Sequence, residues 1–180
     1  MRRAGAKTTG VLSPVIDEHT PSLLIVAGYD SLAHVEQAHA RLDQDQQFAT
    51  ALQAYHGAEG FEYQRMERWL LRAFRTFPSI VPPKTEAGRS HVFELRTYES
   101  ENALTLARKV HMFDHGEIDI FRKVGFQCVF FGYGIASSRM PHLTYMVAFQ
   151  SLADREQGWE RFRKDPEGEK LRTKHEYSNP

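Results

Sequence analysis

An internal repeat with an offset of 120 residues constrains the fold of this chain more than any other feature of its sequence. Residues 21–45 align with residues 141–165 without a gap, and 9 of these 25 positions are identical. Ordinary amino-acid usage would give about one or two identities by chance. The identical residues of the first copy are Pro21, Leu23, Ser31, Leu32, Ala33, Glu36, Gln37, Arg41 and Asp45. Two copies at so long a period indicate duplicated domains and not a solenoid of short repeats.

The two copies are expected to be incomplete at opposite ends. The counterpart of residues 91–121 would precede Met1, so the first copy should lack its first strand and helix. The counterpart of Arg65 would follow Pro180, so the second copy should lack its last strand. The sequence does not distinguish a natural variant from a partial gene product or a shortened expression product.

Composition favours an ordinary globular protein. A chain of 180 residues with 41% hydrophobic residues can form one domain or two small ones. The 23 basic and 23 acidic residues balance, which argues against binding to nucleic acid or to a charged membrane surface. Cys128 is the only cysteine and suits a reducing compartment. No apolar run approaches the length of a membrane span, and no signal peptide is evident, so we expect a soluble cytoplasmic protein.

Strand and helix patterns alternate along the chain. The first copy should contain strands at 8–16, 22–29 and 65–74 and a helix at 32–55. The second copy should contain strands at 91–98, 126–135 and 143–150 and helices at 102–124 and 152–164. We therefore predict a partial β-β-α-β repeat at 1–75, a proline-rich linker at 76–90 and a β-α-β-β-α repeat at 91–180. Superposition of the copies gives β-α-β-β-α-β, the ferredoxin-like pattern, which belongs to the α+β class with antiparallel sheets and helices on one face.

Three segments of the second copy resemble the NIPSNAP family. These are HVFELRTYES at 91–100, KVHMFDHGEIDIFRKVGFQCVFFG at 109–132 and RMPHLTYMVAF at 139–149. The resemblance is strong over about 91–165 and weaker in the first copy. It implies a dimeric α/β-barrel fold, in which two ferredoxin-like sheets face each other. His111, His115 and His142 depart from the residues usual in the family, and any site carried over through them is in doubt.

The resemblance implies a fold but indicates little about the chemistry of the protein. The wider superfamily includes cofactor-free monooxygenases, haem-degrading enzymes and binding proteins, and the activity of NIPSNAP proteins is unsettled. A shared fold does not establish a shared function. The residues themselves must therefore indicate the site.

Glu117 is the most informative candidate residue. It falls in the apolar stripe of the long helix, which is formed at helical spacing by Val110, Phe113, Phe121 and Val124. A carboxylate in this position is costly to bury without a partner. It is either a general base or ligand anchor with a raised pKa, or a structural glutamate that pairs with an arginine such as Arg96.

The strand at 91–98 carries a second group of candidates. Glu94, Arg96 and Tyr98 alternate with Phe93 and Leu95. We expect the two apolar residues to pack on the helices and the three polar ones to line the interior of the barrel that the resemblance implies. There Arg96 would bind an anionic group or pair with Glu117 or Glu94, with hydrogen bonds from Tyr98 and Tyr145. The alternative is a cross-strand ladder of charges on a partly wet sheet.

The remaining candidates are weaker. His111 and His115 share a helix face at metal-compatible spacing, but the pattern is weak and a solvated helix surface is the preferred explanation. Arg139 lies in a turn and is either a residue that closes over a pocket mouth or a solvated loop arginine. Cys128 is expected to be a buried structural thiol. No metal is expected from so weak a histidine pattern. No cofactor is expected either, since Gly132-Tyr133-Gly134 lacks the pattern of a phosphate loop.

Two classes of function remain open. The first is a non-catalytic module that binds a partner or a small hydrophobic or anionic ligand and self-associates, or forms a pseudo-dimer of its repeats. The alternative is a cofactor-independent monooxygenase-like or isomerase-like enzyme with an interior Glu/Arg/Tyr site. The first is preferred because the sequence contains no nucleophile elbow, redox pair or cofactor loop.

Overall fold

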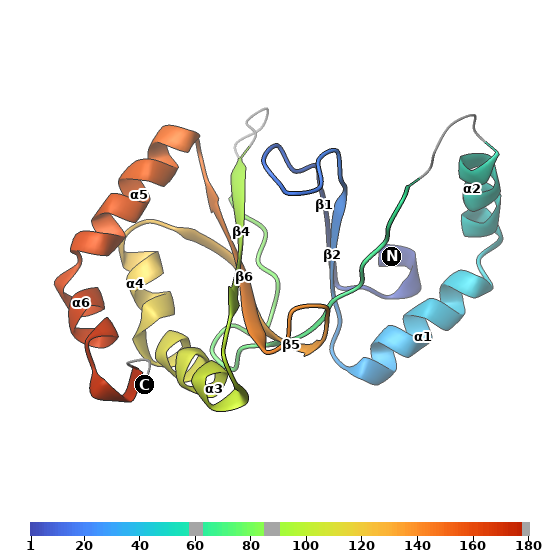
Figure 1. The fold of residues 1–180 in the computed structure, drawn as a ribbon. Coiled ribbons are helices and arrows are strands. Elements are labelled where there is room, and N and C mark those ends of the chain that lie inside the picture. The colour runs from blue at the N-terminus through green and yellow to red at the C-terminus, as the bar shows by residue number, and fades with distance from the viewer. Residues whose placement is uncertain (58–62, 85–90, 178–180) are drawn as a thin grey trace. The chain divides into compact units, whose positions relative to one another are not determined.

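The chain forms two compact units, Met1–Met66 and Glu67–Pro180. The computed structural model (Figure 1) describes residues 1–57, 63–84 and 91–177. Each unit combines helices with antiparallel strands, so the predicted α+β class is confirmed. Within the described residues the sheets have two and four strands, and neither closes into a barrel by itself.

The N-terminal unit consists of a hairpin and two helices. Strands β1 (Thr8–Leu12) and β2 (Leu24–Gly28) pair antiparallel and are followed by α1 (Leu32–Asp43) and α2 (Gln46–His56). A short 3₁₀ turn, η1 (Arg2–Ala4), precedes the hairpin.

The helix predicted at 32–55 is two helices, because the chain contains two N-caps. The Ser31 side chain accepts a hydrogen bond from the His34 amide and starts α1. The Asp45 carboxylate accepts one from the Phe48 amide and starts α2. A side chain that satisfies free amides stabilises a new helix start, and the second cap thus divides the predicted helix.

The C-terminal unit contains a four-stranded sheet in the order β3-β5-β6-β4. Its strands are β3 (Leu70–Ala73), β4 (Val92–Glu99), β5 (Gln127–Ala136) and β6 (His142–Phe149), and every neighbouring pair is antiparallel. The strand predicted at 65–74, which we assigned to the first repeat, therefore pairs with β5 and extends the sheet of the second. Side-chain patterns identify a strand, but they do not identify the edge with which it pairs.

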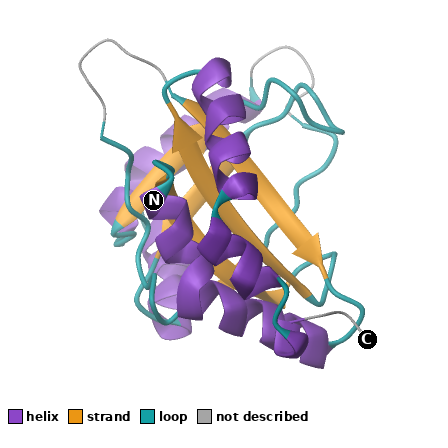
Figure 2. Ribbon diagram, turned by 90° about the vertical axis from the view of Figure 1, so that its left-hand side faces the viewer, coloured by secondary structure: helices purple, strands orange, loops and turns teal. Residues whose placement is uncertain are grey.

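Helices cover one face of this sheet (Figure 2). They are α3 (Ala103–Met112), the kinked segment η2 (Phe113–Glu117), α4 (Ile118–Lys123), α5 (Leu152–Lys164), α6 (Pro166–Arg172) and the 3₁₀ turn η3 (His175–Tyr177). Asn102 and Ser151 cap the helices that follow them, and Gly125, with a φ of 94°, follows the end of α4. Pro166 ends α5 as predicted and begins α6.

The core of this unit is an aromatic cluster between the helices and the sheet. Phe131 and Tyr145 from adjacent strands stack with ring centroids 5.4 Å apart. Phe113 and Phe121 from the helical layer lie 5.4 Å and 5.6 Å from the Tyr145 ring. All four side chains are buried, and buried aromatic pairs contribute beyond their area. This cluster holds the long helical segment against β5 and β6.

No helix in the described part of the chain is long and apolar enough to cross a bilayer.

Candidate functional site

The faces of β4 are the reverse of those predicted. Glu94 and Arg96 point toward the helices, where both contact Trp159 of α5. Phe93 and Leu95 are 37% and 42% exposed on the opposite face. Alternation along the strand was predicted, but which face meets the helices was not. The polar face lies inward because α5 supplies partners for its charges.

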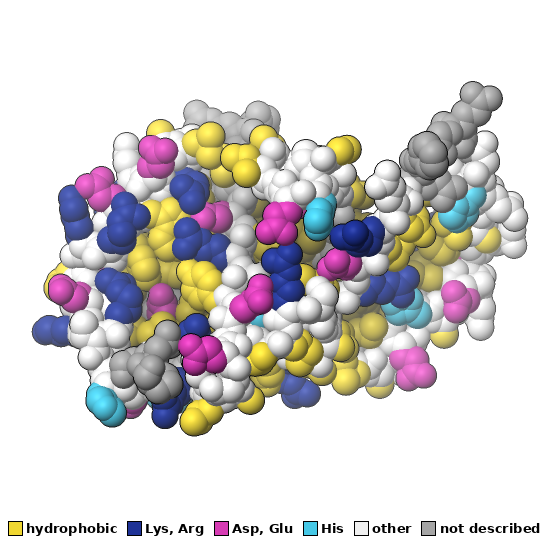
Figure 3. Space-filling model, in the orientation of Figure 1, with side chains coloured by type: hydrophobic (Ala, Val, Ile, Leu, Met, Phe, Trp, Pro, Cys, Tyr) yellow, Lys and Arg dark blue, Asp and Glu magenta, His cyan; other side chains and the backbone are white. Residues whose placement is uncertain are grey.

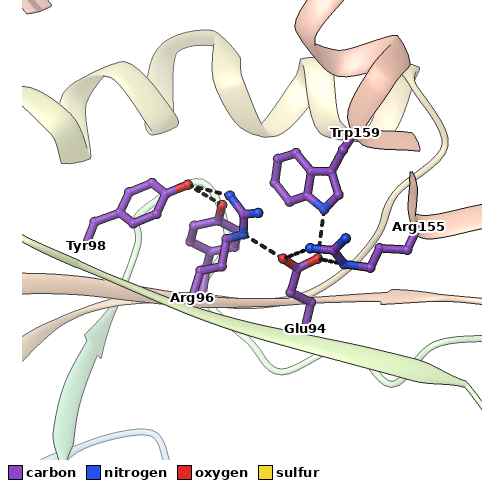
Figure 4. A network of polar contacts seen from close by, with 6 residues as sticks. Glu94, Arg96, Tyr98, Arg155 and Trp159 are labelled. Carbon is purple, nitrogen blue, oxygen red and sulfur yellow. Dashed lines mark hydrogen bonds and ion pairs between the residues drawn. The ribbon is translucent and has the colours of Figure 1, made fainter. Parts of the chain in front are cut away.

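Glu94 forms the centre of a polar network between β4 and α5 (Figure 4). Arg155 donates two hydrogen bonds to its carboxylate, at 2.8 Å and 2.9 Å, and Trp159 Nε1 donates one at 2.7 Å. Arg96 Nε donates another at 2.8 Å. Burial acts to raise the pKa of Glu94, but these donors outweigh it and hold the pKa below its ordinary value. Glu94 is therefore ionised and structural.

Arg96 connects this network to two tyrosines. Its guanidinium lies 3.8 Å from the centre of the Trp159 ring and donates to the Tyr98 hydroxyl at 3.1 Å. The hydroxyls of Tyr98 and Tyr145 lie 2.9 Å apart. Burial raises the pKa of Tyr145, so its hydroxyl keeps its proton. Arg96 pairs with Glu94 and not with Glu117, because α5 and β4 already surround it with acceptors and an aromatic face.

Glu117 points inward from the kinked segment η2, where His115 and Gly116 depart from helical backbone angles. Gly116, with a φ of 158°, allows the irregular turn, and a side chain there would meet Leu171 of α6 at 3.1 Å. Glu117 is only 6% exposed, as its position in the apolar stripe predicted.

The Glu117 carboxyl is buried without a hydrogen bond to its Oε2 from any described residue. Burial raises its pKa to about 7, against a partial opposing effect of the Arg172 charge. Nη1 of Arg172 is also buried and unpartnered among the described residues. The helical layer thus holds a carboxyl and a guanidinium, each with unused hydrogen-bonding capacity.

Both side chains line a cavity of about 420 Å³. Among the described residues that line it, one is acidic and four are basic, and the rest are mainly aromatic; the lining comprises Arg96, Tyr98, Lys109, Met112, Phe113, Glu117, Trp159, Phe162, Arg163, Arg172 and Tyr177. On the left of Figure 3, over the helices of this unit, Lys and Arg side chains surround hydrophobic side chains. Such a cavity suits a small ligand with an apolar body and an anionic group.

The structure brings together only part of the predicted set. Arg96, Tyr98 and Glu117 line the cavity, while Glu94 and Tyr145 support Arg96 and Tyr98 from behind. Arg139 lies in the β5–β6 turn, 3.9 Å from a Glu99 oxygen, and does not line the cavity.

The two histidines of α3 and η2 interact with each other and with the C-terminal turn. Their rings stack at 3.8 Å, His115 Nδ1 lies 2.8 Å from the His111 carbonyl oxygen, and His111 Nδ1 lies 2.8 Å from the Tyr177 hydroxyl. Across the described parts of the chain, no three side chains of metal-binding type come together. Cys128 is half-buried, and burial raises the pKa of its thiol to about 12, so it is unreactive.

Sequence reasoning missed the basic side chains contributed by other helices. Lys109, Arg163 and Arg172 line the cavity but lie on α3, α5 and α6. Trp159 and Arg163 are four residues apart on α5, and this spacing places them on one face. Arg172 gives no comparable signal, because its approach to Glu117 depends on the turn between α5 and α6.

The family comparison agrees with the predicted resemblance. The NIPSNAP family model matches residues 93–178, a range that includes every residue lining the cavity. No curated protein matches the chain. This match assigns residues 93–178, which form most of the C-terminal unit, to the NIPSNAP family.

Proposed function

We propose that the C-terminal unit binds a small ligand with a hydrophobic body and an anionic group. The observation that carries this proposal is that Glu117 and Arg172 line one cavity and that each has a buried polar atom without a hydrogen-bond partner among the described residues. A buried polar atom without a partner costs about 1–3 kcal/mol, and a ligand that satisfies both atoms recovers part of that cost.

The chemistry of the lining indicates how such a ligand would be oriented. Its anionic group would accept hydrogen bonds from Arg172, with Arg163 and Lys109 nearby in the lining. Its apolar body would lie against the aromatic side chains of Phe113, Phe162 and Trp159. Protonated Glu117 would donate a hydrogen bond to the anion or to a neighbouring acceptor on the ligand.

A catalytic role is the second candidate, and the raised pKa of Glu117 is the observation that favours it. A carboxyl with a pKa of about 7 is suited to general acid–base catalysis near neutral pH, as in an isomerase or a cofactor-independent monooxygenase. Arg96 is bound to Glu94, whereas Arg172 is the cation whose charge acts on the Glu117 carboxyl. Binding requires fewer assumptions and is the preferred function.

Binding of 2-naphthoate, with neutral 2-naphthamide as the matched compound, tests the proposal. We expect calorimetry to show that the carboxylate binds more tightly, and that Arg172→Gln reduces its affinity about tenfold or more, since a charge-assisted hydrogen bond contributes about 1.5–3 kcal/mol. Lys164→Gln, on an exposed part of α5, is the control and should leave the affinity unchanged. Equal binding of the two compounds, or full affinity in Arg172→Gln, would contradict the proposal.

A further inference from the structure

A second polar cluster lies on the sheet face opposite the helices of the C-terminal unit. Tyr98 and Tyr145 meet on the face toward the helices, so their strand neighbours Thr97 and Thr144 lie on the other face. The hydroxyls of these two threonines are 3.0 Å apart, and the register of β4 and β6 pairs the two residues directly. His142, two residues before Thr144 on β6, shares their face.

The His142 imidazole is hydrogen-bonded at both of its ring nitrogens. Its Nε2 lies 2.6 Å from Oγ of Ser137, which begins the turn after β5. Its Nδ1 lies 3.0 Å from Oγ1 of Thr144. A hydroxyl, an imidazole and a third group that orients the imidazole are the parts of an activated nucleophile. They are recognised by this geometry and occur on unrelated folds.

Surrounding residues of the same unit fix the imidazole in this position. A Cβ at Gly134 would lie 2.8 Å from His142 Nε2, so the ring can approach β5 because residue 134 has no side chain. The Trp69 ring packs on the imidazole with the ring centroids 5.1 Å apart. Glu67 accepts hydrogen bonds from Trp69 Nε1 and from the Ser138 hydroxyl, both at 3.2 Å, and so connects Trp69 to the β5–β6 turn. Such a supporting layer preorganises a reactive pair.

The charge state of His142 suits a general base. Burial lowers the pKa of the imidazole below its ordinary value of 6.5, and the Arg139 charge acts in the same direction. The Leu143 backbone and the Glu99 charge oppose this effect without reversing it. The ring is therefore neutral at pH 7, and one of its nitrogens can accept a proton.

We propose that Ser137 is a nucleophile that takes an acyl group from an activated ester, with His142 as its general base and Thr144 as the residue that positions His142. In this arrangement Nδ1 carries the ring proton and donates it to Thr144, while Ser137 donates to Nε2. An activated ester is the expected class of substrate, because its good leaving group lessens the need to stabilise an oxyanion.

The reaction can be followed atom by atom. Oγ of Ser137 attacks the carbonyl carbon of the ester while its proton passes to Nε2 of His142. The bond from that carbon to the leaving oxygen then breaks, and the proton on Nε2 passes to the alcohol that leaves. Water attacks the acyl-serine with His142 again as the base, which releases the acid and restores Ser137. The sum of these steps is hydrolysis of the ester.

Reaction of the full chain with 4-nitrophenyl acetate, followed by acid quenching and mass spectrometry of the peptides, tests the proposal. We expect Ser137 to be acetylated faster than its neighbour Ser138, which is the internal control. His142→Asn should slow acetylation of Ser137 on the order of 100-fold or more, since a general base contributes about 10²–10⁴ in rate. His115→Asn is the matched control and should not slow it, because the His115 Nδ1 contacts a carbonyl oxygen of its own helical segment.

Two further measurements distinguish a nucleophile from a purely structural network. In the parent chain, acetylation of Ser137 should accelerate with rising pH and level off below pH 7, where the proton is lost from His142. Thr144→Val should slow the reaction, and Thr144→Ser, which keeps the hydroxyl, should restore it. The experiments on the parent chain need no variant, so they test the proposal even if His142→Asn fails to fold.

Four results would overturn the proposal. The first is no acetyl group on Ser137 of the parent chain, and the second is acetylation of Ser137 no faster than that of Ser138. The third is an equal rate in folded His142→Asn, and the fourth is a rate that keeps rising in proportion to hydroxide above pH 7. Ser137, His142 and Thr144 are not among the described residues that line the cavity, so this proposal and naphthoate binding can fail independently.

Discussion

At the scale of single residues, Glu117 shows what a sequence pattern can and cannot predict. A carboxylate in the middle of an apolar stripe was expected to be buried, and it is 6% exposed. Its expected partner, Arg96, binds Glu94 instead. Helical periodicity determines which residues face inward, but the choice between two arginines depends on contacts between distant segments. In place of the predicted ion pair with Arg96, the structure has a carboxyl whose Oε2 lacks a hydrogen-bond partner among the described residues and on which the Arg172 charge acts.

This difference changes the expected effect of Glu117→Gln. A carboxyl whose pKa rises from 4.5 to about 7 on folding opposes folding once it is ionised, by up to about 3 kcal/mol. The folded state binds the extra proton between those pH values, so this penalty is absent below about pH 4.5 and is complete above about pH 7. Glu117→Gln should therefore be more stable than the parent at pH 8, and the difference should shrink toward pH 5.

Urea denaturation of both proteins at pH 5 and pH 8 measures this effect. Glu160→Gln, on the exposed side of α5, is a control that should not show the same pH dependence. A Glu117→Gln variant that is less stable than the parent at pH 8 would contradict this prediction and support the hypothesis of a structural ion pair.

At the scale of elements, the sequence predicted most strands and helices but not all their partners. Capping residues, proline and alternation located β4, β5, β6, α3 and α5 within a few residues. The sequence did not show that β3 joins β5, or which face of β4 meets the helices, because both depend on contacts between distant segments. The kink at His115 and Gly116 was also missed, since a stripe at helical spacing looks the same with or without a local irregularity.

The kink in the long helical segment should depend on the absence of a side chain at residue 116. Gly116→Ala would place a methyl group 3.1 Å from Leu171 in a backbone conformation that favours glycine. We expect a loss of about 1–3 kcal/mol in the free energy of unfolding, together with weaker naphthoate binding as Glu117 and Arg172 shift. Gly10→Ala, where the nearest atom is 3.9 Å away, is the control for both measurements. An unchanged stability would show that this turn is not constrained by α6.

At the scale of the whole molecule, each unit contains a β-hairpin and helices, but the two units differ in how these elements pack. The C-terminal unit has a complete helical layer over its sheet and a cavity within that layer, and the N-terminal unit has a two-stranded sheet with the helices α1 and α2. The capping residues Ser31 and Ser151 are 120 residues apart and both begin helices, while the duplication itself stays a prediction. The repeat did not indicate the cavity, because Lys109, Arg163 and Arg172 come from helices whose packing it does not specify.

The central claim is that an anionic ligand binds beside Glu117 while this carboxyl is protonated. Calorimetric titration of 2-naphthoate at pH 6 and pH 8 tests it most directly, because this ligand stays ionised over the range whereas Glu117, with a pKa of about 7, does not. We predict tighter binding at pH 6, proton uptake on binding at pH 8, and affinity that is independent of pH in Glu117→Gln. Affinity that is the same at both pH values in the parent, or a pH dependence that persists in Glu117→Gln, would contradict the claim.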